Sequence, residues 1–123
     1  MAASREAILE TITRYVDYLT QSADQVVPLF AEGATVEDPV GTEVRTTRES
    51  IREFFAGAEA PNKVTKLGIV RIAGGQAAFS FELSFETNGK RYSLTPIDVM
   101  TFDESGLITS LRAFWGSGDI VRS

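Results

Sequence analysis

The chain has 123 residues, 43% of them hydrophobic and 24% charged, which is ordinary for a single globular domain spanning residues 1–123. It contains neither cysteine nor histidine, which excludes disulfides and thiolate metal sites and leaves any acid–base catalysis to Asp, Glu, Tyr or Lys. The formal net charge is −5 and the basic residues form no cluster, so we expect no nucleic-acid partner.

Helical patterns dominate the first half of the chain. Apolar residues recur with helical spacing over residues 4–20, on a stripe that includes Tyr15, and Ser4 is a suitable N-cap. Capping-box patterns that begin at Ser22 and at Thr46 predict a second and a third helix, with a short strand over 34–38 between them. Since no segment resembles a signal peptide or a membrane span, we expect a cytoplasmic protein without a membrane partner.

The second half of the chain shows the period-two pattern of strands. Apolar and polar residues alternate over 78–86, Asn88-Gly89 is typical of a type I′ hairpin, and two further strands follow at 94–102 and 107–115. Three helices followed by antiparallel strands predict an α+β fold in which a curved antiparallel sheet forms a cup that the helices close.

Asp98 is the most unusual residue, because it lies within the otherwise apolar strand 94–102. Strand parity places it on one face with Met100 and Phe102. An unpaired buried carboxylate is costly, so such a group either finds a partner or keeps its proton through a raised pKa. Asp98 therefore either pairs with an arginine, such as Arg112 or Arg71, or serves as a neutral hydrogen-bond donor.

Two further polar residues have ordinary structural explanations when each is taken alone. Tyr15 lies on an apolar helix stripe, where tyrosines commonly line cores. Asp38 precedes Pro39, a combination that often begins a turn. Alternation puts Glu37 and Asp38 on opposite faces, and we assign Glu37 to the solvent side.

Four segments together carry a family resemblance: Ala34-Thr35-Val36-Glu37-Asp38-Pro39-Val40-Gly41, Pro96-Ile97-Asp98-Val99-Met100-Thr101-Phe102, Arg14-Tyr15-Val16 and Arg112-Ala113-Phe114-Trp115. They resemble the bacterial Δ5-3-ketosteroid isomerases, members of the cone-shaped α+β superfamily that includes nuclear transport factor 2 (nuclear transport factor 2-like, or cystatin-like, folds). The likeness extends over nearly the whole chain.

The resemblance implies a role for each of the three polar residues. Asp38 would be the general base that moves a proton from the α to the γ carbon of a 3-oxo-Δ5-steroid, giving the 3-oxo-Δ4 isomer. Tyr15 and a protonated Asp98 would form the oxyanion hole for the dienolate. A raised pKa at this aspartate is a known property of the family. The reaction requires no cofactor and no metal.

The resemblance also implies a steroid or similar flat apolar ketone as ligand, and a homodimer packed through the outer sheet faces. Parity allows six apolar side chains to line the binding site: Phe81, Leu83, Phe85, Met100, Ala113 and Trp115. Some relatives have tyrosines where this chain has Phe30 and Phe55, so Tyr15 has a smaller hydrogen-bond network here.

Two alternative functions remain open on the same fold. One is a hydrolase or cyclase of the epoxide hydrolase type, which typically uses an Asp-Arg-Asp set, but no arginine lies on the inward face of the Asp98 strand. The other is a non-catalytic dimer module that binds apolar ligands, which has no need to bury a carboxylate opposite a tyrosine.

Overall fold

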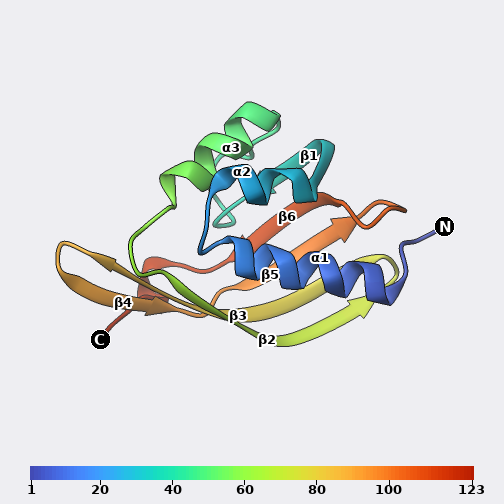
Figure 1. Cartoon of the computed structure of the whole chain (residues 1–123). Helices are drawn as coiled ribbons and strands as arrows, with labels where there is room; N and C mark the ends of the chain where they lie inside the picture. Colours follow the sequence, from blue (N-terminus) through green and yellow to red (C-terminus); the bar gives the residue numbers. More distant parts are fainter.

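The computed structural model describes all residues, 1–123, and places three helices on one side of a curved, seven-stranded sheet (Figure 1). The helices are α1 (Arg5–Tyr18), α2 (Ala23–Val26), which continues into the 3₁₀ helix η1 (Val27–Leu29), and α3 (Arg48–Gly57). The strands are β1 (Phe30–Glu37), β2 (Val64–Ala73), β3 (Gln76–Thr87), β4 (Lys90–Leu94), β5 (Ile97–Phe102), β6 (Ile108–Phe114) and β7 (Val121–Arg122), with η2 (Ser117–Asp119) before the last. None of the helices combines the length and the apolar character needed to cross a membrane.

The helix starts agree only partly with the capping patterns. Ser4 caps α1 as predicted, because its side chain accepts a hydrogen bond from the backbone of Ala7. The capping box expected at Ser22 is wrong, since that side chain makes no cap hydrogen bond and α2 has only four residues. The box of α3 begins at Thr47, one residue after the predicted Thr46, because the Thr47 hydroxyl reaches the N–H of the third helical residue.

The sheet is mixed rather than wholly antiparallel. The strand order is β1-β6-β5-β3-β4-β7, with β2 paired to β3, and the β1–β6 pair runs parallel. The prediction of an antiparallel sheet is therefore wrong at this edge, where the long connection between β1 and β6 permits a parallel pair. The predicted hairpin at Asn88-Gly89 is confirmed, since both residues have positive φ between β3 and β4.

The core lies between the helices and the concave face of the sheet, where eighteen buried residues form one cluster. Strand β5 shows how the sheet contributes: Ile97 is 52% exposed, whereas Asp98 is 1% exposed and Met100 is fully buried. This confirms the predicted parity and places Asp98 on the face that the helices cover. The fold is therefore the predicted α+β cup, and it presents one carboxyl to its own interior.

Candidate active site

A mainly apolar cavity of about 120 Å³ lies between the helices and the concave sheet face. Its fourteen lining residues are Tyr15, Leu19, Asp38, Phe54, Phe55, Ala58, Lys63, Phe81, Leu83, Leu94, Pro96, Asp98, Ala113 and Trp115. The three polar residues singled out in the sequence, Tyr15, Asp38 and Asp98, come from α1, the end of β1 and the middle of β5. The fold thus brings them to one cavity.

Asp98 has no partner in the protein. Neither of its carboxyl oxygens makes a hydrogen bond, although both are buried. The alternative of an arginine pair does not hold, because Arg112 donates to Glu37 (3.1 Å) and Arg71 donates to the carbonyl of Val70 (3.0 Å). Burial, followed by the negative charge of Asp38, raises the pKa of Asp98 well above its usual value. This environment favours the neutral acid, which can donate a hydrogen bond into the cavity.

Tyr15 lies in a cage of phenylalanine rings. Its ring packs edge-on against Phe30, Phe55, Phe79 and Phe81, with centroids 6.0–6.5 Å apart. Burial raises the pKa of Tyr15 well above its ordinary value, and the carboxyls of Asp98 and Asp38 add to the effect. The phenol therefore keeps its proton, and a group that enters the cavity can accept a hydrogen bond from it.

The segment that carries Asp38 is fixed on both sides by contacts to β6. Glu37 points outward, as assigned from the sequence, and accepts a hydrogen bond from Arg112 (3.1 Å). Beyond Asp38, the N–H of Val40 donates to the carbonyl of Ala113 (2.8 Å). These two contacts hold the end of β1 against β6 and leave Asp38 facing the cavity.

Trp115 donates the only side-chain hydrogen bond that Asp38 accepts, from Nε1 to Oδ1 at 2.8 Å. Burial raises the pKa of Asp38 above its ordinary value, and this hydrogen bond and the charge of Lys63 oppose that rise without reversing it. The sequence indicated Trp115 only as an apolar wall residue and gave no signal for Lys63, because a lysine before a strand is usually a surface residue. The two carboxyls thus lie in different environments. Asp38 has a hydrogen-bond donor and a nearby cation, whereas Asp98 has neither.

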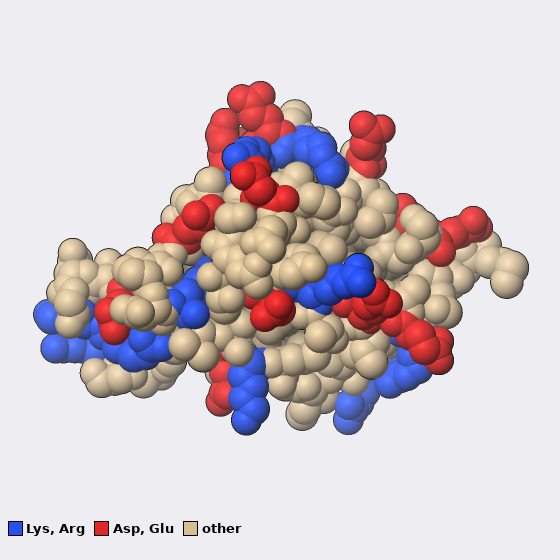
Figure 2. Space-filling model, in the orientation of Figure 1, with Lys and Arg blue, Asp and Glu red and all other residues tan.

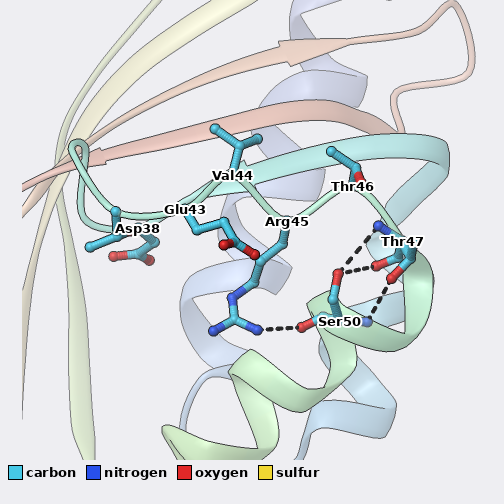
Figure 3. Close-up of a pocket in the computed structure, with 8 residues that line it drawn as sticks. Asp38, Glu43, Val44, Arg45, Thr46, Thr47 and Ser50 are labelled. Atoms are coloured by element: carbon cyan, nitrogen blue, oxygen red, sulfur yellow. Dashed lines mark hydrogen bonds between the residues drawn. The ribbon is translucent and has the colours of Figure 1, made fainter.

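A second, polar pocket of about 410 Å³ adjoins Asp38 along the loop 42–47 and the start of α3 (Figure 3). Arg45 lies in this pocket but donates to the carbonyl of Ser50 (3.0 Å), and its guanidinium lies 5.2 Å from the Phe54 ring centroid. Figure 3 shows Asp38 at the other end of the pocket, apart from these contacts. Arg45 is therefore held by α3 and makes no ion pair with Asp38.

Four of the six predicted wall residues line the cavity, and two lie elsewhere. The four are Phe81, Leu83, Ala113 and Trp115. Met100 is fully buried in the core cluster, and Phe85 stacks on Tyr92 in the β3–β4 hairpin, with ring centroids 5.9 Å apart. Strand parity gives the face of a residue but not its depth, which is why it could not separate these two from the wall.

The buried carboxyl of Asp98 is expected to make the protein less stable as pH rises. Its folded-state pKa lies above the unfolded value of about 3.9. Between these two pKa values the folded protein binds more protons at this group than the unfolded chain does, so the free energy of unfolding falls as pH rises through this window. Each pH unit in this window costs about 1.4 kcal/mol for one proton.

Urea unfolding of the wild type and of Asp98→Leu, from about pH 5 to about pH 7, checks this expectation. The variant should gain stability over the wild type as pH rises. Glu37 and Asp103 have lowered pKa values and act in the opposite direction, whereas Asp38 has a raised pKa and acts in the same direction as Asp98. All three carboxyls are present in both proteins, so the difference between the curves reports Asp98 together with its charge coupling to Asp38. Parallel stability curves would contradict the raised pKa of Asp98.

Comparisons with known proteins agree with this fold and with the family resemblance. Residues 12–111 match the SnoaL-like domain family. The chain is 42% identical over 111 residues to a steroid Delta-isomerase of Nocardioides simplex, an alignment that covers 89% of this chain and 90% of that protein.

Among solved structures, the epoxide hydrolase/cyclase-like enzyme SalBIII, described as acting in pyran ring formation in the polyether salinomycin, superposes with a TM-score of 0.89. The two chains are 28% identical, and the match covers 98% of each. The family match, the similar isomerase and the shared cup lead to one assignment. The chain belongs to the SnoaL-like family of nuclear transport factor 2-like folds.

Proposed function

We propose that this protein is a steroid Δ-isomerase that converts 3-oxo-Δ5-steroids to 3-oxo-Δ4-steroids. The observation that carries the proposal is the unpaired, buried carboxyl of Asp98, which shares an apolar cavity with Tyr15 and with the differently placed Asp38. Enolisation of a ketone requires one base and a stabiliser for negative charge on oxygen. The cavity offers both, and the similar isomerase of Nocardioides simplex supports the assignment.

In the proposed mechanism, Asp38 removes a proton from the carbon between the ketone and the double bond. The electron pair of that C–H bond shifts toward the ketone oxygen, which Tyr15 and protonated Asp98 stabilise as donors. Asp38 then returns the same proton to the γ carbon, the dienolate collapses to the conjugated enone, and the base is regenerated. An ionised Asp98 would repel the oxyanion, so the burial of this group is required for its role.

The size of the cavity determines how such a substrate would enter. Ligand pockets commonly measure roughly 300–1,000 Å³, well above the 120 Å³ found here. The ketone-bearing end of a steroid would therefore occupy the cavity, and its other end would extend out of it, past the wall to which the paired Leu83 and Leu94 of β3 and β4 contribute.

An absorbance assay tests the proposal, because isomerisation creates a conjugated enone from an unconjugated ketone. The wild-type protein should accelerate enone formation from 5-androstene-3,17-dione, with catalytic turnover well above one product per chain. Binding of the phenolic steroid equilenin without any turnover would favour the non-catalytic module instead.

Epoxide opening is the second candidate, favoured by the structural likeness to SalBIII. No arginine lines the cavity, whose one basic residue is Lys63, so the Asp-Arg-Asp set of epoxide hydrolases is incomplete. Product analysis after incubation with a terpene epoxide separates the two: diol formation without steroid isomerisation would replace our proposal by this one.

We also propose that the protein is a homodimer that packs through the outer face of the sheet. Ile97 and Phe114 are register partners on β5 and β6, and Ile97 also pairs with Ser80 of β3. Ile97 and Phe114 are 52% and 43% exposed, so they form an apolar row that a second copy would cover.

Sedimentation equilibrium tests the dimer. The wild type should behave as twice 13.4 kDa, and Ile97→Glu should shift the equilibrium toward monomer because it places a charge in the interface. A wild-type protein that stays monomeric at high concentration would overturn this part of the proposal.

A further inference from the structure

Lys63 is a cation in an otherwise apolar and acidic cavity. Charged side chains are dispersed over the molecular face shown in Figure 2, but Lys63 is the one basic residue among the fourteen that line the cavity. It precedes β2 and is half-buried. Nothing in the proposed proton transfer uses this residue.

The backbone at Lys63 lies well along the sheet from Asp98, while its ammonium group lies near Asp38, on the same cavity. Its neighbour Val64 pairs with Ser84 on β3, whereas Asp98 pairs with Phe79 on the same strand. These two positions on β3 are five residues apart, or roughly 17 Å along a strand. A ligand whose ketone meets Asp98 and which extends along β3 past Asp38 would therefore bring its remote part toward the Lys63 end of the strand.

The ammonium group of Lys63 is incompletely partnered. One of its three N–H groups donates to the carbonyl of Ala58 (3.0 Å), and it forms no ion pair with any carboxylate. Glu59, the adjacent acidic residue, accepts instead from the backbone of Ala23 (3.1 Å). Burial lowers the pKa of Lys63, while Glu59 and Asp38 oppose that shift, so an additional negative partner would stabilise the ammonium.

We infer that Lys63 is a specificity-determining residue that binds a carboxylate or a comparable acidic group at the end of the substrate remote from the enolised ketone. The preferred substrate class would then be 3-oxo-Δ5-steroids that carry an acidic substituent at the distal ring or side chain. The inference rests on the proposed isomerase function, because that function fixes which end of the ligand reaches Tyr15 and Asp98.

Two matched ligands test the inference: 3-oxo-4-androstene-17β-carboxylic acid and its methyl ester. The affinity of each is measured by its displacement of bound equilenin from three proteins, the wild type, Lys63→Met and Lys66→Met. Lys66 is the matched control, since it is an exposed lysine on β2 outside the cavity lining. The wild type should bind the acid more tightly than the ester. Lys63→Met should weaken acid binding about tenfold and leave ester binding unchanged, as expected for loss of one charge-assisted hydrogen bond. Lys66→Met should change neither.

Equal binding of acid and ester by the wild type, with equilenin and the ester still bound, would overturn the role of Lys63 and leave the isomerase proposal standing. A wild type that binds none of the three steroids would overturn both. Lys63 could instead act through Asp38, whose pKa its charge lowers. In that case Lys63→Met would move the pH profile for turnover of a neutral steroid to higher pH, and the ratio of acid affinity to ester affinity would stay as in the wild type. This result also overturns the inference.

Discussion

Replacement of Asp38 by asparagine is expected to lower kcat for steroid isomerisation by about 10³-fold, the scale of a lost general base. The amide of asparagine cannot take a proton from carbon at neutral pH. Asp98 is the one other carboxyl that lines the cavity, and its raised pKa favours the neutral acid, which is not a base. The hydrogen bond from Trp115 can still be made to the amide oxygen, so the loss should be in chemistry rather than in the position of the side chain.

Equilenin binding separates this expectation from a simple loss of folding. The charge of Asp38 disfavours further negative charge in the cavity, as its effect on the pKa values of Tyr15 and Asp98 indicates. Asp38→Asn removes that charge, so a phenolic steroid whose oxygen lies beside Tyr15 and Asp98 should bind the variant at least as tightly as it binds the wild type. Glu53→Gln, which neutralises an exposed carboxylate on α3, is the matched control and should keep wild-type turnover. Full activity in Asp38→Asn would show that another group is the base.

Replacement of Asp98 by leucine should lower kcat by roughly 10²–10³-fold, the usual effect of removing one donor from an oxyanion hole. The leucine fits an apolar site but donates nothing to the dienolate. Asp98→Asn should keep a larger share of the activity, because its N–H can still donate. Tyr15→Phe should lose activity on the same scale as Asp98→Leu, since the second donor is then missing.

The pH dependence of turnover gives an independent test of the same residue. In the wild type, activity should fall at high pH as Asp98 loses its proton, whereas this high-pH loss should be absent in Asp98→Asn, whose amide does not titrate. An Asp98→Leu protein with wild-type kcat would show that Asp98 does not touch the reacting oxygen.

The sequence predicted those parts of the fold that depend on local periodicity. Alternation along β5 was enough to assign Asp98 to the inner face, because a strand turns successive side chains to opposite sides. Asn88-Gly89 was enough for the β3–β4 turn, because few other residue pairs adopt two positive φ angles. The parallel pairing of β1 with β6 could not be predicted in this way, since it joins segments far apart in the chain.

The candidate site was only partly accessible to the same reasoning. Parity could not tell that Met100 belongs to the core, nor that Phe85 lies beyond the cavity in the hairpin, because depth depends on the curvature of the whole sheet. The contact between Trp115 and Asp38 arises where the end of β6 passes the end of β1. The position of Lys63 depends in turn on how the connection between α3 and β2 closes over the cavity.

The cup itself does not decide the chemistry, because this chain resembles both a protein described as steroid Delta-isomerase and one described as epoxide hydrolase/cyclase-like. The feature of this chain that bears on the chemistry is the pair of carboxyls in different environments. Asp38 accepts a hydrogen bond and lies near a cation, whereas Asp98 is buried and has no hydrogen-bond partner. Such a pair separates the roles of base and acid within one cavity.

Carbon-13 NMR of the aspartate side-chain carboxyls, assigned with Asp38→Asn and Asp98→Asn, measures this difference in protonation directly. At neutral pH, the account predicts that Asp98 shows the chemical shift of a protonated acid and does not titrate until well above neutral pH, while Asp38 shows that of an ionised carboxylate. An Asp98 signal that is already ionised at neutral pH would contradict the oxyanion hole, and with it the proposed isomerase mechanism.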